Sequence, residues 1–390
     1  MKIAFVAPFF GAQAAGGAEF AARTLATQLA VAGLHIEVLT TCLQDLTTGL
    51  DRSIYPEGVS TDGLLHIRRF PVPKPDMRHF GALNELILSG AEITDAEERQ
   101  FMTRHVTSPQ LLEWIAAHRA DYDWFCFIPY LFGTTCFGVP IAGNKSITIP
   151  CFHDEGYTHM KLVQRMVQHT ERFVFNAAAE QRFAQQRFQI PDSRCHTVGL
   201  GMETEIAGDA ARFRRKTGIA EPFVLYAGRR DTTKNVHTLI QYFLAYKQGH
   251  PGNLKLALIG PAPLPMAGSH PDILDLGFVS EQDKYDAYTA ASVFCHPSLN
   301  ESFSYVMMEA WLCHTPCLVH ADCAVTSDHV RTSNGGFTFR SAADFAAMLQ
   351  RLLEDPSLAD ALAAQGRDYV RDHYAWPRIV ERFQNDVFAG

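Results

Sequence analysis

The first forty residues alternate between apolar and polar stretches in a way that predicts a strand, a loop, a helix and a second strand. KIAFVAP is an apolar run, GAQAAGG is a glycine-containing loop, and the next segment has Ala21, Leu25 and Leu29 at helical spacing. Gly33 follows this segment, and HIEVLTT is the next apolar run. A helix with one apolar face between two apolar runs indicates a βαβ unit.

The same alternation continues along the chain. Four later segments of the first half are predicted as strands: LLHIRRF, DWFCFI, KSITIPCF and RFVFNA. After Pro222 the pattern starts again with the strand FVLYAGR, the helix KNVHTLIQYFLAYKQ and the strand LKLALIG. Further helices are predicted over residues 341–354, 357–372 and 376–388. Strands that alternate with helices predict parallel sheets with helices on both faces.

A charged, glycine-containing segment, GDAARFRRKTGIAEP, interrupts this alternation and marks a domain boundary. One domain is predicted over residues 1–205 and the other over 206–374, which suits a chain of 390 residues. The predicted fold class is α/β, with two Rossmann-like doubly wound parallel-sheet domains facing across a cleft. Because such sheets bind ligands at the carboxyl ends of their strands, we expect the site in this cleft.

Composition and charge restrict the class of function. Hydrophobic residues make up 47% of the chain and charged residues 19%, which favours a globular enzyme over a disordered protein. The net charge of -8 argues against nucleic-acid binding, which needs a basic surface. Nine cysteines without a C-x-x-C pair indicate free thiols in a reducing compartment, so we expect a cytoplasmic protein.

Two apolar segments resemble membrane signals. MKIAFVAPFF is interrupted by Pro8 and is interpreted as a buried first strand rather than a signal peptide. Residues 124–144 are uncharged and long enough to cross a membrane, but prolines at 129 and 140 and glycines at 133 and 138 break the run. We expect a short buried strand there, followed by a second short element.

The first glycine loop does not fit a dinucleotide cofactor. Gly11, Gly16 and Gly17 do not form G-x-G-x-x-G, and Thr40 and Thr41 stand where an acid for the ribose is needed. Gly16 and Gly17 lie directly before a helix, where backbone N–H groups can approach an anion or a sugar hydroxyl. A plain flexible turn is the alternative.

Two cations are expected at the matching place in the second domain. Gly228 and Arg229 end the strand FVLYAGR, and Lys234 begins the next helix. A guanidinium and an ammonium group near a helix N-terminus favour a bound diphosphate. A solvated surface is the alternative.

The stretch NESFSYVMMEA places Glu301 and Glu309 eight positions apart. VFCHPS is predicted as a strand, and residues 302–313 as the helix after it. Eight residues of helix span about 12 Å, whereas the two carboxyl groups of a retaining glycosidase lie about 5 Å apart. Two separate hydrogen-bonding roles along an extended ligand therefore fit better than an acid/base pair.

Together these motifs resemble glycosyltransferase family 4, whose members are retaining enzymes of the GT-B fold. The resemblance covers nearly the whole chain and rests on Gly16-Gly17, His153 in CFHDEG, Gly228-Arg229 with Lys234, and the E-x(7)-E frame of ESFSYVMMEA. It implies that a last helix, over residues 375–390, returns to the first domain. It also implies transfer of a hexose-type sugar from a UDP-, GDP- or ADP-sugar to a hydroxyl of a glycan, a lipid-linked glycan or a small molecule.

The resemblance further implies a role for each motif. Glu301 would contact the transferred sugar, and Glu309 the ribose hydroxyls. Arg229 and Lys234 would bind the diphosphate and stabilise it as the leaving group, and His153 would contact the sugar from the first, acceptor-side domain. The other donor-binding candidates lie in loops or at helix starts: Ser302, Phe303, Ser304, Gly228, Gly16 and Gly17. Candidates for a nucleobase pocket are Phe278 and Val279.

Some positions depart from the family pattern. Glycine is usual in the family where Ser302, Ser304 and His314 stand and is frequent at Asn235, and an acid is common at Thr233. A serine at 302 or 304 narrows the space for the donor sugar, which leaves the identity of that sugar open.

No enzyme nucleophile stands out, so we expect a same-face displacement by the acceptor hydroxyl, assisted by the departing phosphate. A sugar-nucleotide epimerase of the same architecture is the alternative.

No metal or other cofactor is expected. Asp121 and Asp123 have the D-x-D spacing but precede a strand of the first domain, and we interpret them as part of a surface turn. The histidines and acids of residues 153–159 could imitate metal ligands, but His153 is better explained as a sugar contact.

Residues 66–79 combine cations with aromatic residues and prolines. They could meet a lipid-linked acceptor or the inner face of a membrane, with a solvated loop as the alternative.

Overall fold

The computed structural model describes all residues except 14–15, 47, 75–76, 231, 262–269 and 390. Its chain divides into two compact units: Met1–Gly201 with Ile379–Gly390, and Met202–Arg378. These divisions lie close to the predicted ones at 205/206 and 374/375. The charged segment that marks the predicted boundary is not a linker, because it contains the helix α8 (Ala210–Thr217) inside the second unit.

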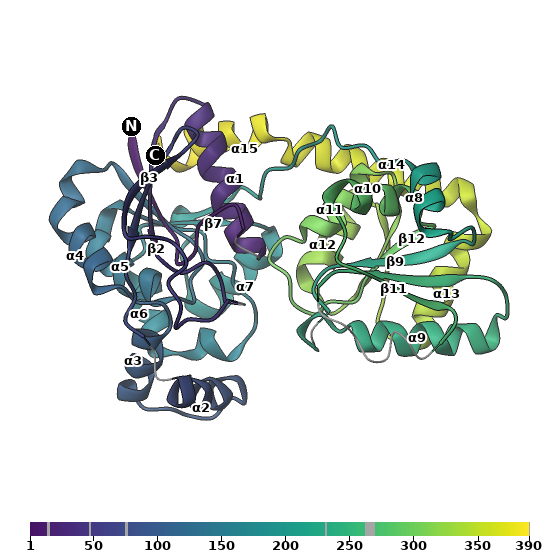
Figure 1. Cartoon of the computed structure of the whole chain (residues 1–390), viewed down its shortest axis with the longest axis horizontal. Helices are drawn as coiled ribbons and strands as arrows, with labels where there is room; N and C mark the ends of the chain where they lie inside the picture. The colour runs from purple at the N-terminus through teal and green to yellow at the C-terminus, as the bar shows by residue number, and fades with distance from the viewer. Residues whose placement is uncertain (14–15, 47, 75–76, 231, 262–269, 390) are drawn as a thin grey trace. The chain divides into compact units, whose positions relative to one another are not determined.

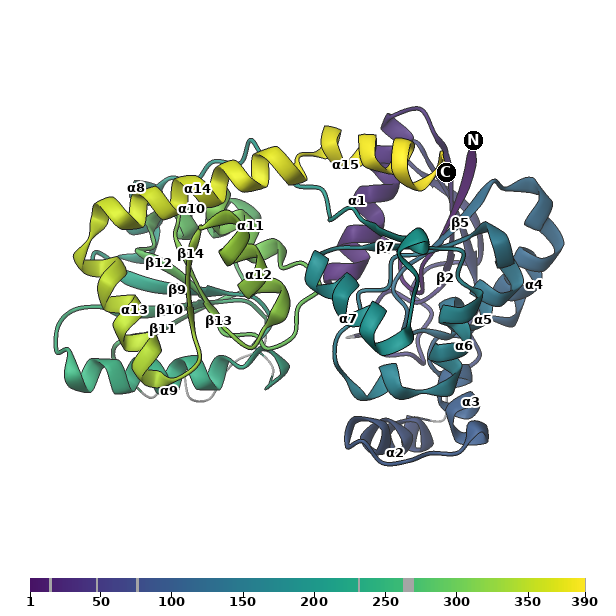
Figure 2. The ribbon, with the colours of Figure 1, turned by 180° about the vertical axis from the view of Figure 1, so that it is seen from behind.

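The first unit contains an eight-stranded sheet in the order β3-β4-β2-β1-β5-β6-β7-β8 (Figures 1 and 2). Its strands are β1 (Lys2–Val6), β2 (His35–Thr41), β3 (Gly58–Asp62), β4 (Leu65–Phe70), β5 (Trp124–Phe127), β6 (Ser146–Thr148), β7 (Arg172–Phe175) and β8 (Cys195–Thr197). All neighbours are parallel except β3 and β4. Every residue of β3 is exposed, so this edge strand lacks the apolar run that would predict it.

Seven α-helices of the described chain belong to the first unit: α1 (Gly17–Val31), α2 (Met77–Leu88), α3 (Asp95–Arg104), α4 (Pro109–His118), α5 (Gly133–Ala142), α6 (Lys161–His169) and α7 (Ala178–Phe188). The uncharged run 124–144 folds as β5 followed by α5, as the proline and glycine breakers predict. Over the residues that the structure describes, no helix combines the length and the apolar character needed to span a bilayer.

The second unit contains a six-stranded, fully parallel sheet in the order β11-β10-β9-β12-β13-β14. Its strands are β9 (Phe223–Ala227), β10 (Lys255–Ile259), β11 (Ile273–Gly277), β12 (Val293–His296), β13 (Cys317–His320) and β14 (Gly336–Phe339). Its helices, besides α8, are α9 (Val236–Gly249), α10 (Glu281–Ala290), α11 (Tyr305–Leu312), α12 (Ala324–Ser333), α13 (Ala342–Glu354) and α14 (Pro356–Tyr374). Two α/β units with largely parallel sheets confirm the predicted doubly wound fold.

The end of the chain belongs to the first unit, as predicted. Helix α15 (Trp376–Arg382) is followed by a π-helical turn, and from Ile379 onward the chain is part of that unit. Phe383 is 1% exposed, and Arg382 donates a hydrogen bond to the Val198 carbonyl at 2.8 Å. Figures 1 and 2 both show the two ends of the chain near one another. The last residues therefore help to complete the core of the first unit.

We predict that Phe383→Ala destabilises the first unit by about 3 to 5 kcal/mol, because it empties a buried aromatic site. Hydrogen exchange of the β7 amides in increasing urea measures this loss, since the two units need not unfold together. Phe20→Ala is the matched control, because Phe20 is 49% exposed and its removal should cost less than about 1 kcal/mol. Equal losses in the two variants would contradict the prediction.

Candidate active site

The order of the second sheet reverses between β9 and β12. From β9 the chain continues outward to β10 and β11, and it then returns to β12 on the other side of β9. Such a switch point is where open α/β sheets bind ligands, beyond the carboxyl ends of the strands. Gly228 and Arg229 directly follow β9, and Glu301 follows β12 by five residues. The topology therefore brings together two of the predicted motifs.

Glu301 and Lys234 form an ion pair at this switch point. The Lys234 Nζ lies 2.6 Å from the Glu301 Oε1, and only 19% and 12% of the two side chains are exposed. The same carboxylate oxygen lies 2.9 Å from the His296 Nε2, which acts as the donor because an ionised carboxylate can only accept. Burial disfavours the charge on Glu301, but Lys234 and His296 outweigh burial and lower the pKa of Glu301 below its usual value.

His296 was not singled out by the sequence. It is the last residue of β12, is 2% exposed and packs between aromatic rings, with the rings of Phe294 and Tyr226 nearly parallel to its own. The available signal was a histidine at the carboxyl end of an otherwise apolar strand. Its position there makes it a support for the Glu301 carboxylate.

Arg229 and Arg230, in the turn after β9, have different environments. The Arg230 guanidinium is buried, bonds to Asp275 and donates to the Gly260 carbonyl at 2.7 Å. Arg229 is exposed, while its carbonyl accepts a hydrogen bond from the Tyr226 hydroxyl. Arg230 therefore holds the turn, and the diphosphate role of Arg229 stays a prediction.

Gly228 is required by this turn. It has φ 147°, and its carbonyl oxygen would lie 1.8 Å from a Cβ placed on Gly260. The two glycines thus allow the ends of β9 and β10 to approach each other closely.

Glu309 lies on α11 and has its own partners. Its carboxylate contacts the Lys284 Nζ at 2.7 Å and the Tyr288 hydroxyl at 3.2 Å. Burial raises the pKa of Glu309 above its usual value, although both partners act in the opposite direction. Lys284 and Tyr288 are four residues apart on α10, so they lie on one face of that helix. Neither partner could be recognised from the sequence.

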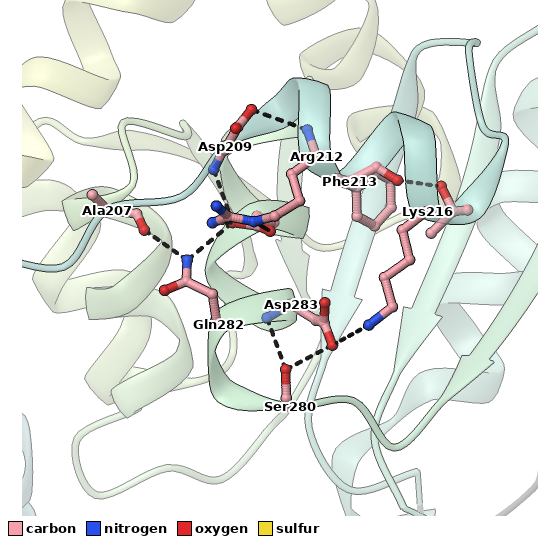
Figure 3. A network of polar contacts seen from close by, with 10 residues as sticks. Ala207, Asp209, Arg212, Phe213, Lys216, Ser280, Gln282 and Asp283 are labelled. Atoms are coloured by element: carbon pink, nitrogen blue, oxygen red, sulfur yellow. Dashed lines mark hydrogen bonds and ion pairs between the residues drawn. The ribbon is translucent and has the colours of Figure 1, made fainter.

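Helix α10 is fixed to α8 by a network of polar contacts (Figure 3). Asp286, which is 1% exposed, pairs with Arg212 and accepts from the Asp209 amide at 2.9 Å. Farther along the two helices, Lys216 pairs with Asp283 at 2.6 Å. Because α10 carries both partners of Glu309, this network helps to hold those partners in place.

The start of α11 differs from the prediction. The helix begins at Tyr305 rather than at residue 302, because Ser304 has φ 77° and ψ 74°, which no helical residue adopts. The Ser304 hydroxyl is buried and makes no hydrogen bond among the described residues. Phe303 is 1% exposed, and the centroids of its ring and the Tyr374 ring are 5.0 Å apart. Because its side chain is buried, only its backbone can contact a nucleotide-sugar donor. Ser302 is half-buried.

Positive φ angles explain the expected glycines. Ser304, His314 and Asn235 have φ of 77°, 63° and 56°, and the family resemblance would place glycine at each. A side chain is strained in this region, whereas glycine is not. Asparagine is the most tolerant of the three, and the Asn235 amide also donates to the Pro297 carbonyl at 3.1 Å. Backbone conformation, not only room for a sugar, therefore accounts for these positions.

Candidates in the first unit lie at loops after strands. Gly16 precedes α1 with φ 155°, and a Cβ there would lie 2.0 Å from the Glu19 Oε2, while Gly17 begins the helix with open space around its Cα. His153 is half-buried in the loop after β6. The neighbouring Phe152 amide donates to the Glu180 Oε1 at 2.7 Å, and burial raises the pKa of Glu180 to about 8.

Two further predictions are placed by the structure. Phe278 is 83% exposed and Val279 is half-buried, in the loop between β11 and α10, and their nucleobase role stays a prediction. Membrane contact through the segment 66–79 also stays a prediction, and positions 75 and 76 lie outside the described residues. Arg68 pairs with Glu37 at 3.0 Å, and Arg69 is 6% exposed and donates to the Phe10 carbonyl.

Candidate metal ligands of the first unit have other contacts. Asp123 accepts a hydrogen bond from the Lys2 amide at 2.7 Å, and Glu155 accepts from the Tyr130 hydroxyl at 2.7 Å. Across the described part of the chain, no three His, Cys, Asp or Glu side chains form a group that could hold a metal ion.

The second unit is similar to known glycosyltransferases. Residues 209–369, which are less than half of the chain, match the family model of the glycosyl transferases group 1. A D-inositol 3-phosphate glycosyltransferase of Acidothermus cellulolyticus is 28% identical over 234 residues, which cover 54% of this chain and 51% of that protein. The chain thus spans about half the length of the curated relatives it matches.

Several solved structures are similar in fold to the chain over nearly its whole length. HepE of Anabaena, in complex with UDP-glucose, has a TM-score of 0.71 at 15% identity, with 99% of each chain covered. The trehalose-6-phosphate enzyme of E. coli, bound with UDP-2-fluoro glucose, has a TM-score of 0.73 at 10% identity, covering 100% of this chain and 99% of that one. The predicted GT-B fold is therefore confirmed.

We predict that Ser304→Gly stabilises the second unit by about 1 kcal/mol, because glycine relieves the left-handed backbone and removes a buried hydroxyl without a hydrogen bond. Denaturant unfolding of the second unit measures the change. Ser302→Gly is the matched control: Ser302 does not have a positive φ, so the added flexibility of the unfolded chain should lower its stability. If Ser304→Gly lowered the stability as much as Ser302→Gly does, the backbone of Ser304 would not be strained.

Glutamine at the two glutamates should affect the stability of the second unit differently. Glu301→Gln leaves the buried Lys234 without its counter-charge and should lower the unfolding free energy at pH 7 by about 3 kcal/mol. Because the pKa of Glu301 is lowered, its contribution is present above its usual value of 4.5 and is lost as the pH falls below it. The deficit of this variant should therefore shrink in acid.

Glu309→Gln should cost little or should stabilise at pH 7, because a raised pKa means that the fold disfavours the ionised form. Urea unfolding of both variants at pH 7 and pH 4 distinguishes the cases. Equal destabilisation by the two substitutions would show that the two carboxylates have equivalent environments.

Proposed function

We propose that the chain is a retaining glycosyltransferase that moves a hexose-type sugar from a nucleoside diphosphate sugar to an acceptor hydroxyl, without a metal ion. The observation that carries the proposal is the buried Lys234–Glu301 pair at the switch point of the group 1 domain. Because HepE and the E. coli enzyme were solved with UDP-glucose or its analogue, UDP-glucose is the first donor to test.

Lys234 and Arg229 would supply the positive charge that this reaction needs. As the bond between the anomeric carbon and the diphosphate breaks, its electron pair passes to the phosphate oxygen, and fixed cations stabilise that charge. An ammonium group has three donors, so Lys234 can keep its bond to Glu301 and still contact a phosphate. The acceptor oxygen would attack from the same face and give its proton to the departing phosphate.

The two glutamates would orient the donor. Glu301 is ionised and has one oxygen held by Lys234 and His296, so it can accept hydrogen bonds from hydroxyls of the transferred sugar. Glu309 would bind the ribose hydroxyls, with α10 holding Lys284 against it. The name of the curated relatives adds inositol phosphate to the acceptors worth testing, beside glycans and lipid-linked glycans.

A donor panel tests the proposal. UDP-, GDP- and ADP-sugars are incubated with the protein, with and without myo-inositol phosphate or a glycan acceptor, and the released nucleotide is measured. We expect release that depends on acceptor, a retained anomeric configuration by NMR, and no loss of rate with EDTA. Release without acceptor, or an isomerised sugar nucleotide, would favour the epimerase instead.

Lys234→Ala and Glu309→Ala should each lower kcat/KM by at least about 100-fold, because electrostatic and orienting contacts of this kind contribute that much. Lys161→Ala is the control. Lys161 also forms a lysine–carboxylate pair, at 2.7 Å from Asp95, but 63% of its side chain is exposed and it lies in the first unit. Full turnover by either site variant would exclude the proposed site.

A further inference from the structure

A cavity of about 660 Å³ lies at the opposite edge of the second sheet from Glu301. Its wall includes the residues that immediately precede four strands: Pro222 before β9, Leu254 before β10, Ser292 before β12 and Pro316 before β13. The strands are parallel, so their amino ends share one edge of the sheet. Lys234 and Glu301 follow carboxyl ends, which makes this cavity separate from the proposed donor site.

The cavity wall carries a pair of polar side chains from different elements. His314, just after α11, places its Nε2 2.6 Å from the Asp360 Oδ1 on α14. About a third of the His314 side chain and most of the Asp360 side chain are exposed, at 35% and 73%. A ligand in the cavity can therefore reach a carboxylate that is already oriented by an imidazole.

His314 has a backbone conformation that favours glycine over any residue with a side chain. Its φ of 63° is strained for histidine, whereas glycine would fit there without strain. Strained backbone persists only where the surrounding structure fixes it, and a side chain retained at such a position is grounds for a functional hypothesis. The side chain lines the cavity, so the hypothesis concerns a ligand of the cavity.

The wall also includes a flat ring. His250 stacks on Tyr246 with ring centroids 4.4 Å apart and planes 8° from parallel, and His250 is exposed. The amide of Gln350, bonded to the Tyr246 hydroxyl, also belongs to the wall. A ring face beside hydrogen-bonding side chains suits a ligand that has both C–H faces and hydroxyl groups.

The charges of the wall indicate which ligand fits. None of its lining residues is a lysine or an arginine, so a phosphate would lack a strong partner, and Asp360 would repel it. Asp360 is also the one carboxylate among these lining residues, which is too few for a hard divalent cation. We propose that this cavity binds a neutral saccharide, with Asp360 and His314 hydrogen bonded to its hydroxyls and His250 against its ring.

Binding can be followed through the histidine ring resonances of the full chain by NMR. The probes are methyl α-D-glucopyranoside, methyl α-D-mannopyranoside, maltose and cellobiose, with inorganic phosphate as the anionic comparison. We expect a saturable shift of the His250 and His314 resonances with at least one saccharide and none with phosphate. Absence of a saturable shift with all four saccharides, or saturable binding of phosphate in their place, would overturn the proposal.

Two variants localise the site. His314→Gly and Asp360→Asn should each weaken saccharide binding at least tenfold, as followed at His250. His314→Gly should fold with an unchanged or higher thermal midpoint, because it removes a strained residue, so loss of binding would not reflect unfolding. Lys161→Ala, whose exposed side chain lies in the first unit, is the control and should bind the saccharide normally. Unchanged affinity in both cavity variants would place the saccharide elsewhere.

Discussion

The buried, ionised carboxylate of Glu301 is the constraint on which the site of the second unit depends. Removing a carboxylate from water costs several kcal/mol, and the cost is recovered only when charged and hydrogen-bonding partners are fixed close to it. Lys234 comes from the turn after β9, and His296 from the end of β12. These partners converge only because β9 and β12 are neighbours at the point where the strand order reverses. The sheet topology is thus required for Glu301 to be ionised. The ionised carboxylate in turn holds together the segments that follow β9 and end β12.

The loop that carries Glu301 is held from the opposite direction by packing. Phe303 lies under Tyr374 and beside His329, while the Tyr374 carbonyl accepts a hydrogen bond from the Met202 amide at 2.8 Å. Met202 is the first residue of the second unit, so this loop shares an anchor with the place where the chain enters that unit. Polar contacts fix the Glu301 end of the loop, and an aromatic cluster fixes its middle. Ser304 then takes the left-handed conformation that lets α11 start.

Much of the fold could be predicted because parallel strands are buried on both faces and appear as continuous apolar runs. All five residues of β9 are buried, and its run was unmistakable. The edge strand β3 was missed because all of its residues face solvent. Two cations of residues 66–79 have partners that their local sequence does not indicate: Arg68 and Arg69 lie on β4, and their long side chains reach back to Glu37 and to main-chain carbonyls.

The site could be predicted only as far as its parts are local in sequence. Glu301, Lys234 and Glu309 stand at motif positions, but their partners are set by tertiary contacts. Lys284 and Tyr288 reach Glu309 from another helix, and nothing in their own neighbourhood distinguishes them. The start of α11 was misplaced because a serine at positive φ is exceptional, and propensity alone favours continuing the helix upstream.

Tertiary contacts also make the two glutamates of the E-x(7)-E frame chemically different. Glu301 receives an ammonium and an imidazole on one oxygen, and these overcome burial, so it remains an acceptor. Glu309 also has a lysine, but its second partner is a neutral hydroxyl, and burial prevails and raises its pKa. A ligand beside Glu301 therefore meets a fixed negative charge, which suits the positive charge that develops on a sugar as its leaving group departs. A ligand beside Glu309 meets a carboxyl group that is easier to protonate, and donor hydroxyls such as those of a ribose would favour its ionised form. The motif supplies the carboxylates, and the helices around them decide what each can do.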